Sequence, residues 1–448
     1  MQEVDTAVLM QEAKFELTEL FFSITKHDST ILSGNDTFVR ISGYERDEII
    51  GQFHNIIRHQ DMPRVIFKVF WDYLKANKPI VAYVKNKTKE GAYYWVFAVV
   101  FPLGEEYISI RIKPTTPIFT AVRELYFRLL MAESKMQMQE SEELLFDLLN
   151  ELGYRDYDHF MSEVLLAELV ERRKLLASHK GGGEKEGHPH IKPLYEVSKK
   201  LFFGYSKWFE KIESFVNIKC QFEEKGYMLR TLARDIVLLS LNASVASYKL
   251  EANGETFGVL ASDIRTNAKE NDVLIGKIDR IAQHLSETLN ELIFMVSYVS
   301  LQMEMVTYFV KEMCEKNNPV LDNSVNTLYS LVSMYNTKLE ELPIQLQKAV
   351  TDSIAYLDEL DQQVMYLGYV QIYGIIESAR CTDDKLGFNE IFSQLKTLIN
   401  KTLNEIVSMK KMTESFFTDN EMLLKELKQT DIMLQRFANE ITIIKRMD

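Results

Sequence analysis

Two patterns of hydrophobic and polar positions divide the chain near residue 117. Up to that point, short runs of β-branched and aromatic residues alternate with turn-forming clusters, a pattern typical of strands. Beyond it, apolar residues recur at steps of three and four over long stretches, which is typical of helices that pack through one face. The pattern therefore predicts a strand-containing N-terminal domain followed by a largely helical remainder.

The N-terminal part is predicted to form an α+β domain over residues 17–117, preceded by a helix over residues 1–16. Four runs predict strands, and they begin at Phe21, Val81, Tyr93 and Tyr107. Residues 35–69, between the early and late runs, have the pattern of short helices. An antiparallel sheet with helices on one face is the simplest arrangement of these elements.

The helical remainder is predicted to contain a connector, a linker and a bundle. Residues 118–179 form the helical connector, and the glycine-rich, charged segment 180–193 forms a flexible linker. Beyond the linker, four apolar seams follow heptad spacing, and they start at Leu201, Leu274, Leu321 and Leu395.

The breaks between these seams predict the layout of the bundle. Turn signals near Asn253, Asn318 and Asp383 separate four segments of similar length, each a rod on the order of 90 Å at roughly 1.5 Å per residue. Four such rods predict an all-α, elongated four-helix coiled-coil bundle made of two helical hairpins, residues 194–318 and 319–448. Pro343 lies inside the third rod and predicts a kink or a local break there.

Composition narrows the function class. The 448 residues include 52 Lys and Arg against 65 Asp and Glu, a formal net charge of −13, without a basic block. This balance argues against a binder of nucleic acid or of anionic membranes. Because no apolar run reaches the roughly 20 residues of a membrane span and the N-terminus has no signal-peptide pattern, we expect no membrane span and a cytoplasmic location. We find no catalytic signature motif or metal-ligand spacing, so neither enzyme activity nor a metal site is expected.

One segment of the N-terminal domain points to a family. Residues 42–63, SGYERDEIIGQFHNIIRHQDMP, strongly resemble the PAS domain of aerotaxis receptors, and the resemblance extends over roughly residues 17–115. In that family the PAS pocket commonly holds FAD, so the resemblance implies a flavin site. It also implies that Arg58, His59 and Asp61 take part in binding the flavin.

Two departures from the family pattern leave other ligands open. Ile80 stands where flavin-binding members carry a tryptophan, and Gln60 replaces a proline of the His-Pro-Asp motif. A haem held by a pocket histidine, or no cofactor, are the alternatives. In the simplest structural interpretation, Arg58 and Asp61 pair to cap a helix, and His59 is a packed polar residue.

A second motif lies at the first turn of the predicted bundle. Residues 238–265 resemble, without a gap, the cytoplasmic hairpin tip of methyl-accepting chemotaxis receptors. The resemblance implies that the tip binds a chemotaxis histidine kinase and its coupling protein. The positions carried over from the family as partner-binding are Asn242, Lys249, Phe257, Val259 and Asp263. Lys249 replaces the arginine of the family motif.

The chain also resembles itself. A shift of 131 residues lays Val245–Thr266 over Ile376–Thr397 without a gap, which adds Glu377, Arg380 and Phe388 to the predicted tip residues. We therefore predict two duplicated hairpins that form a monomeric pseudo-dimer, with both tips at one end and the turn at 317–319 at the other, near the N-terminal domain. The alternative is an elongated homodimer.

Two functions remain in competition. In the first, the chain is a cytoplasmic transducer for redox or oxygen taxis, which passes a signal from the PAS domain to the bundle. In the second, it is a structural adaptor derived from a chemoreceptor, which docks at a chemoreceptor array or a flagellar structure. Arg58, His59 and Asp61 favour the sensor, whereas the degenerate tips favour the adaptor.

Overall fold

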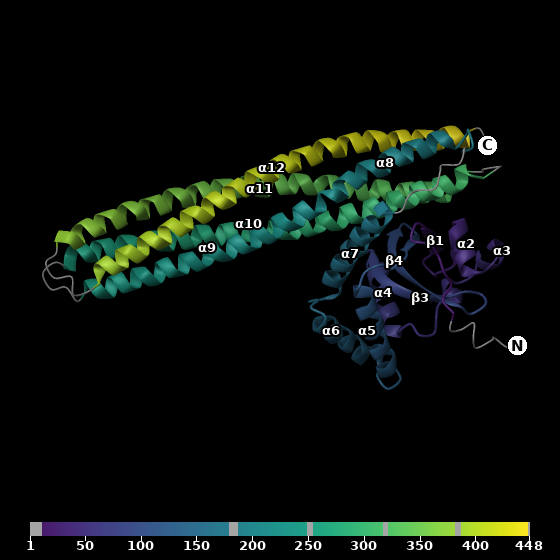
Figure 1. Ribbon diagram of the computed structural model, residues 1–448, viewed down its shortest axis with the longest axis horizontal. Coiled ribbons are helices and arrows are strands. Elements are labelled where there is room, and N and C mark those ends of the chain that lie inside the picture. The colour runs from purple at the N-terminus through teal and green to yellow at the C-terminus, as the bar shows by residue number, and fades with distance from the viewer. Residues whose placement is uncertain (1–10, 179–186, 249–253, 317–320, 381–386, 447–448) are drawn as a thin grey trace. The chain divides into compact units, whose positions relative to one another are not determined.

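The computed structural model describes residues 11–178, 187–248, 254–316, 321–380 and 387–446. It divides into two compact units: Met1–Phe209 with Phe294–Lys338 and Gln429–Asp448, and Glu210–Ile293 with Leu339–Lys428. The first unit holds a sheet, short helices and the helix segments packed on them, and the second holds the remaining lengths of four long helices (Figure 1).

A five-stranded antiparallel sheet forms the centre of the first unit. Its strands are β1 (Phe21–Lys26), β2 (Ile31–Gly34), β3 (Ile80–Lys87), β4 (Tyr93–Leu103) and β5 (Glu106–Ile112), in the order β2-β1-β5-β4-β3. In β4 every residue from the second to the tenth is buried, so the sheet is covered on both faces rather than on one. This confirms the predicted α+β domain with an antiparallel sheet.

Short helices cover one face of the sheet: α2 (Asp36–Ser42), α3 (Arg46–Ile49), η1 (His54–Ile57) and α4 (Arg64–Lys75). Asn35 caps α2, and its Oδ1 accepts hydrogen bonds from the backbone N–H groups of Phe38 and Phe22. A Cβ at Gly34 would lie 2.4 Å from the Phe38 ring, so only glycine permits this close passage from β2 into α2.

Three connector helices follow: α5 (Ile118–Glu133), α6 (Met138–Glu151) and α7 (Tyr157–Ser178). Helix α6 packs on α4 and α5, whereas α5 and α7 pack on the opposite face of the sheet. The fully buried Glu168 of α7 joins them to the sheet. Its carboxylate accepts hydrogen bonds from the backbone N–H and hydroxyl groups of Thr115 and Thr116, and from the Tyr83 hydroxyl at 2.8 Å. These five donors compensate for the burial of the charge.

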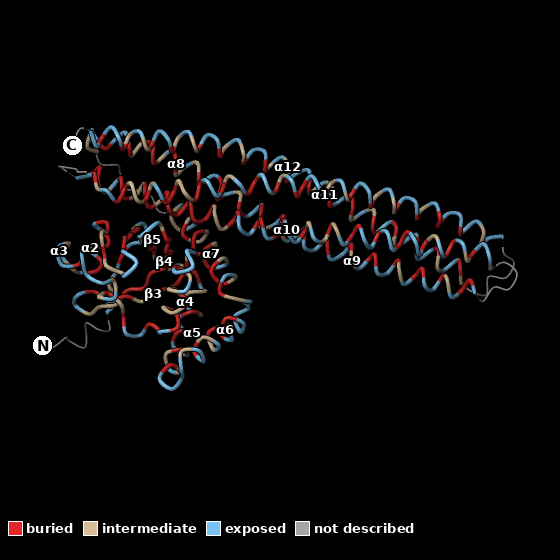
Figure 2. Tube along the Cα trace, turned by 180° about the vertical axis from the view of Figure 1, so that it is seen from behind, coloured by how far each residue is buried: buried red, intermediate tan, exposed pale blue. Residues whose placement is uncertain are grey.

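The rest of the chain consists of long helices: α8 (Lys192–Glu210), α9 (Ile212–Ser247), α10 (Gly254–Cys314), α11 (Ser324–Arg380) and α12 (Phe388–Lys445). In Figure 2 the buried residues run along one side of these helices, as the heptad pattern predicts. The predicted turns lie largely outside the described residues, but the helices end and begin on either side of them.

In the first unit, the sheet packs directly on two long helices. Phe22 of β1 contacts Phe309 of α10 with ring centroids 4.9 Å apart, and Phe101 of β4 contacts Tyr298 of α10 at 4.9 Å and Tyr335 of α11 at 5.3 Å. All four aromatic pairs, including Tyr298 with Tyr335 at 5.7 Å, have edge-to-face geometry. The end of α10 that precedes the predicted turn at 317–319 therefore lies against the N-terminal domain.

In the second unit, segments of four helices from one chain form a closed four-helix bundle. Phe215 of α9 contacts Phe416 of α12, Lys410 of α12 pairs with Asp361 of α11, and the Lys277 ammonium of α10 lies over the Tyr356 ring of α11. The remaining pair of neighbours, α9 and α10, is joined by the ion pair of Arg230 with Asp279. Each of the four helix segments thus contacts two neighbours from the same chain.

Both predicted tips lie together in this unit. The Phe257 and Phe388 rings, three residues after the start of α10 and at the start of α12, stack with centroids 4.3 Å apart. These two phenylalanines are the partners in the 131-residue shift, so the helix ends that carry the duplicated motif meet across the bundle.

Four details of the elements differ from the prediction. Strand β2 lies outside the four predicted strand runs. The described residues 11–16 contain no helix, because Ala13 N donates to Tyr93 O and the segment runs beside β4. Helix α11 continues through Pro343, whose carbonyl accepts a hydrogen bond from Asn420 Nδ2 at 2.8 Å, so a local break there is wrong. The first rod is two helices, α8 and α9, which separate at Lys211.

The linker prediction falls partly on residues that are not described. Its described end, residues 187–193, contacts α10: the His188 backbone N–H donates to Cys314 O at 2.8 Å. Helix α8 begins at Lys192, inside the predicted linker. This end of the segment is therefore packed rather than free.

Helix α10 is the one described helix that is long and apolar enough to cross a membrane by length and composition. In the structure, 72% of its apolar window is buried. Burial against the sheet and α11, through side chains such as Tyr298 and Phe309, accounts for this apolar composition.

The carboxyl group of Glu312 provides a test of the packing between α10 and α2. It accepts a hydrogen bond from Thr37 Oγ1 at 2.6 Å, while Glu312 Oε2 has no partner among the described residues. Burial raises the pKa of Glu312 in the folded state. Because a raised carboxyl pKa makes the folded state bind the proton more tightly, stability is highest below the unfolded pKa and falls as pH rises through the folded pKa.

We therefore expect Glu312→Gln to raise the melting temperature at neutral pH and to reduce the fall in stability from acidic to neutral pH. Thermal denaturation of the full chain between pH 4 and 8 measures both effects. Glu315→Gln, directly after the C-terminal end of α10 and partly exposed beside Lys311, serves as the control. A lower melting temperature for Glu312→Gln at pH 7 would contradict this account of Glu312.

Candidate functional site

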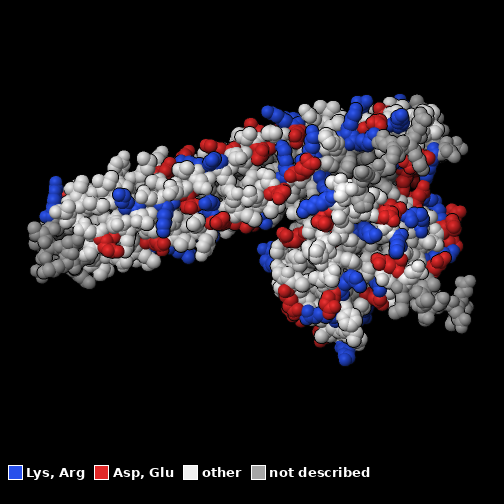
Figure 3. All heavy atoms as spheres, in the orientation of Figure 1, with Lys and Arg blue, Asp and Glu red and all other residues white. Residues whose placement is uncertain are grey.

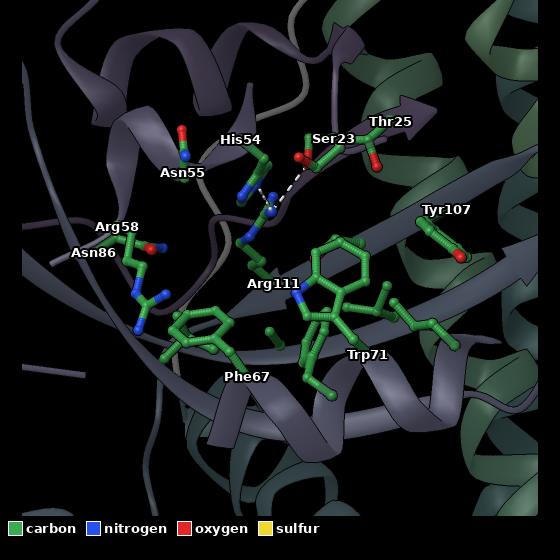
Figure 4. A pocket seen from close by; sticks show the side chains of 17 residues that line it. Ser23, Thr25, His54, Asn55, Arg58, Phe67, Trp71, Asn86, Tyr107 and Arg111 are labelled. Atoms are coloured by element: carbon green, nitrogen blue, oxygen red, sulfur yellow. Dashed lines mark hydrogen bonds between the residues drawn. The ribbon is translucent and has the colours of Figure 1, made fainter. Parts of the chain in front are cut away.

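A cavity of about 120 Å³ lies between the sheet and the helices α4 and η1 (Figure 4). A single water molecule needs roughly 10–15 Å³ of cavity volume, so this cavity has room for a ligand group larger than one solvent molecule. Its wall includes, among other residues, Ser23, Thr25, Asn86, Ala98, Ser109 and Arg111 from the strands, Phe67, Phe70 and Trp71 from α4, and His54, Asn55 and Arg58 from the segment around η1.

Strand alternation creates this cavity. Successive side chains of a strand point to opposite faces, and the residues that face the cavity include the small or polar Ser23, Ala98 and Ser109. Their sequence neighbours on the other face, such as Phe22, Phe97 and Ile108, are large and fully buried. The sheet therefore leaves space on one face and packs tightly on the other.

Arg111 of β5 is the central charged group of the pocket. Its Nη2 donates to Ser23 Oγ at 2.9 Å and lies 2.6 Å from His54 Nε2, as the dashed lines in Figure 4 show. Its Nη1 has no hydrogen-bond partner among the described residues. Burial lowers the pKa of Arg111 to about 10, which leaves the guanidinium charged at neutral pH.

His54 is the neutral partner of this arginine. Burial, followed by repulsion from Arg111, lowers the pKa of His54 to about 3. The imidazole is therefore neutral at physiological pH, and its Nε2 acts as the acceptor for the Arg111 guanidinium, which leaves the ring proton on Nδ1.

Asn86 of β3 adds a second unpaired donor. Its side chain is buried, and its Nδ2 has no hydrogen-bond partner among the described residues. Its backbone forms an isolated bridge with Arg58, so the two residues lie at the same end of the pocket (Figure 4). Unpaired donors that are buried beside a cavity indicate a ligand that carries hydrogen-bond acceptors.

The structure divides the three predicted flavin residues. Arg58 lines the pocket, and its guanidinium lies over the Phe67 ring, 4.0 Å from the centroid. His59 and Asp61 are not among the lining residues. His59 Nδ1 accepts a hydrogen bond from the Asp61 backbone N–H at 3.1 Å, and the half-exposed Asp61 carboxylate pairs with Lys85 at 2.6 Å.

His59 is held as a packed residue. It is buried beside Tyr93, and burial, followed by repulsion from Lys85, lowers its pKa. The alternative that Arg58 pairs with Asp61 does not hold among the described contacts, because the carboxylate of Asp61 contacts Lys85 and His59 instead.

The sequence prediction missed Arg111, His54 and Asn86. For Arg111 a signal was present: in Ile108-Ser-Ile-Arg-Ile112 the isoleucines alternate with Ser109 and Arg111, which places the arginine on the face opposite the apolar residues. His54 and Asn86 have no such signal, since only the folding of η1 over the sheet brings His54 to the pocket.

The predicted tip residues fall into three groups. Phe257 and Phe388 are buried against each other, so their side chains form part of the core instead of a surface for a partner. Arg380 and Glu377 pair on the surface at 2.8 Å. Asn242 and Val259 are exposed, Asp263 is half-buried, and Lys249 lies outside the described residues.

The pocket fits a flavin better than a haem. An isoalloxazine ring is flat and apolar in its body and carries carbonyl and ring-nitrogen acceptors on one edge, which matches an aromatic wall facing the unpaired donors of Arg111 and Asn86. A haem requires an axial ligand, but Nε2 of the pocket histidine, His54, is already occupied by Arg111.

Comparisons with known proteins agree with this site. The family model of the PAS fold matches residues 31–112. Over 109 residues the chain is 43% identical to the aerotaxis receptor of Escherichia coli (strain K12), and the match covers 23% of this chain and 22% of that receptor. The N-terminal region is therefore a PAS domain, and the chain matches about a fifth of the length of this curated relative.

Solved structures align with part of this chain. A LOV domain from the Erythrobacter litoralis EL346 blue-light-activated histidine kinase aligns at 14% identity and a TM-score of 0.20, over 21% of this chain and 94% of that one. A domain of a sensory box sensor histidine kinase/response regulator from Geobacter sulfurreducens aligns at 15% identity and a TM-score of 0.19, over 21% and 82%.

The different positions of Arg58 and Asp61 lead to a prediction. We expect Arg58→Met, which removes a pocket donor, to weaken the binding of added FAD at least about tenfold, because a hydrogen bond from a charged group contributes about 1.5–3 kcal/mol. Asp61→Asn removes an ion pair whose carboxylate is 48% exposed, and we expect it to change affinity little and stability by less than about 1 kcal/mol. Fluorescence titration of the full chain with FAD measures the affinities. Equal losses of FAD affinity in both variants would contradict the assignment of Arg58, and not Asp61, to the pocket.

Proposed function

We propose that this chain is a cytoplasmic, chemoreceptor-like signal transducer for redox or oxygen taxis. In this proposal the PAS pocket binds a flavin, and the helical bundle engages a chemotaxis histidine kinase and its coupling protein without catalysing a reaction itself. The observation that carries the proposal is a sheet with a donor-lined pocket on one face and signalling-type long helices packed on the other.

Reversible electron acceptance is the chemistry that a flavin supplies when bound. The residues of this chain bind and orient the ligand: Phe67 and Trp71 shape the apolar wall, and Arg111 and Asn86 donate to the polar edge. A change in ligand charge would alter the hydrogen bonds of Arg111. One of these bonds runs from Arg111 Nη2 to Ser23 Oγ of β1, at 2.9 Å. Strand β1 is thus linked to the pocket.

From β1 the path to the bundle is short. Phe22, the residue before Ser23, points to the opposite face and contacts Phe309 of α10. Beyond β1, Thr37 of α2 donates to Glu312 of α10. A shift of β1 therefore alters the packing of α10, and a ligand state that favours one packing changes the populations of the two arrangements.

A second path runs through the connector. Glu168 of α7 holds Tyr83 and the Thr115–Thr116 pair at the edge of the sheet. One helical turn further on, the buried Arg172 donates to Glu304 of α10 at 2.9 Å and to the carbonyl of Leu17. Helix α7 is thereby joined by charged groups to both the sheet domain and α10.

The tip-proximal part of the bundle exposes apolar residues that support docking of a partner. On α11 the exposed side chains of Met365, Tyr369, Ile372 and Ile376 follow steps of four, three and four, which places them on one face. Residues 362–376 contain no charged side chain. Exposed apolar patches that lack charge and contain tyrosine and methionine are typical of protein interfaces.

The same face recurs on α9. Leu238, Leu241 and Val245 are exposed there, and a shift of 131 residues carries them onto Tyr369, Ile372 and Ile376. The duplicated hairpins thus repeat the exposed stripe as well as the buried core. Figure 3 shows charges of both signs interspersed with broad uncharged areas along the bundle.

A structural adaptor is the second candidate function. The exposed stripes support it equally, because they require only a docking partner and no signal from the pocket. An adaptor at a chemoreceptor array or a flagellar structure would use the same α9 and α11 faces. The two functions differ in whether the PAS pocket holds a ligand whose state changes.

The absorption spectrum of the purified full chain separates these functions. We expect flavin bands, with release of FAD on heat denaturation, since the pocket presents unpaired donors beside an aromatic wall. A Soret band would show that the bound cofactor is a haem instead of a flavin. A folded chain that neither carries nor takes up FAD would contradict the flavin sensor and support the adaptor.

The stripe on α11 leads to a separate prediction. We expect Tyr369→Glu to reduce binding to the purified chemotaxis histidine kinase and coupling protein at least about tenfold, because it places a charge in the centre of an apolar interface. Ile344→Glu is the matched control, since Ile344 lies on the same helix outside the stripe and is 62% exposed, against 68% for Tyr369. Co-sedimentation measures the binding. Equal binding by both variants and the unmodified chain would exclude the stripe as this docking surface.

A further inference from the structure

Arg111 has no opposite charge in the pocket. It is 2% exposed and is the next-to-last residue of β5, at a register position opposite Ala98 of β4. Its contacts are the neutral Ser23 hydroxyl and the neutral His54 ring, and its Nη1 has no partner among the described residues. None of the residues that line the pocket in the described structure is acidic.

Such a buried cation is costly. Removing a charge from water requires a compensating opposite charge or a full set of hydrogen bonds. The Phe21 and Phe38 rings lie 5.8 and 5.5 Å from the guanidinium carbon and offset part of this cost. A second guanidinium, that of Arg58, also lines the pocket and adds to the positive potential.

We infer that Arg111 is the counter-charge for a ligand that is anionic, or becomes anionic, in the PAS pocket. His54 and Ser23 hold Nη2, while Nη1 is buried and has no hydrogen-bond partner among the described residues. The ligand class is a planar heterocycle whose acceptor edge carries the negative charge. This inference deepens the proposed function and rests on it only where the ligand is identified as a flavin.

For a flavin, the inference concerns the redox equilibrium. Addition of two electrons and one proton to the oxidised isoalloxazine gives a reduced ring with one negative charge. A fixed positive charge beside that ring favours the reduced form over the neutral oxidised form. Arg111 would therefore raise the midpoint potential of the bound ring.

The first measurement needs no flavin. In the ligand-free full chain, Arg111→Met removes the uncompensated charge at similar side-chain volume, so its melting temperature is expected to rise above that of the unmodified chain. Arg40→Gln, which removes one exposed positive charge of the same domain, is the control and is expected to leave it unchanged. A fall in melting temperature for Arg111→Met would show that the protein itself compensates the charge and would overturn the inference.

The second measurement uses FAD as the probe and dithionite as the reductant. In the reconstituted full chain, Arg111→Gln is expected to lower the preference for the reduced over the oxidised ring at least tenfold, which is about 30 mV in midpoint potential for a two-electron couple. Arg111→Lys keeps the charge and is expected to retain most of the potential. An unchanged potential in Arg111→Gln would overturn the inference for the flavin.

The two measurements keep the proposals apart. If the unmodified chain does not take up FAD, the flavin sensor fails, and the melting temperatures of the ligand-free variants still decide whether Arg111 lacks a counter-charge. If FAD binds but its midpoint potential does not depend on Arg111, the flavin sensor is retained and the inferred role of Arg111 as counter-charge is excluded.

Discussion

The organisation of this protein depends on a five-stranded sheet that is buried on both faces. Because side chains alternate along a strand, each strand contributes one set of residues to a ligand pocket and another to the packing of helices. Ser23 and Phe22 illustrate the division: the first contacts Arg111 in the pocket, and the second contacts Phe309 of α10. Pocket and helices are therefore separated by the thickness of one sheet.

Buried polar groups distinguish the two faces. On the helix face, Glu168 receives five hydrogen bonds and Arg172 pairs with Glu304, so these charges are compensated within the chain. On the pocket face, Nη1 of Arg111 and Nδ2 of Asn86 remain unpaired among the described residues. Glu168 and Arg172 are thus satisfied within the chain, whereas these two donors beside the pocket are not.

In the helical part, the presence of two hairpins in one chain has a direct physical consequence. A hairpin with one apolar seam must bury that seam against another hairpin, and two hairpins in one chain satisfy each other. The stacking of Phe257 on Phe388 shows how the equivalent positions meet. On the outer faces of α9 and α11, exposed apolar residues repeat at the same spacing.

The sequence by itself determined the elements. Short β-branched and aromatic runs predicted four of the five strands, the heptads predicted the long helices, and the resemblance in residues 42–63 led to the PAS domain and to Arg58. Long periodic segments are predictable because many residues contribute to the same pattern. The helix expected over residues 1–16 was wrong where it is described, since residues 11–16 run beside β4, a tertiary contact that local propensity does not contain.

Only the tertiary structure decided which polar residues meet. Arg58, His59 and Asp61 are adjacent in sequence, yet the backbone around η1 turns Arg58 toward the pocket and leaves Asp61 with Lys85. Arg111 and His54 are distant in sequence, yet Nη2 of Arg111 lies 2.6 Å from Nε2 of His54. The physical reason is that the hydrophobic pattern and the secondary-structure propensity are local properties of the sequence. The partner of a buried charge is instead determined by strand register and by the packing of η1 over the sheet.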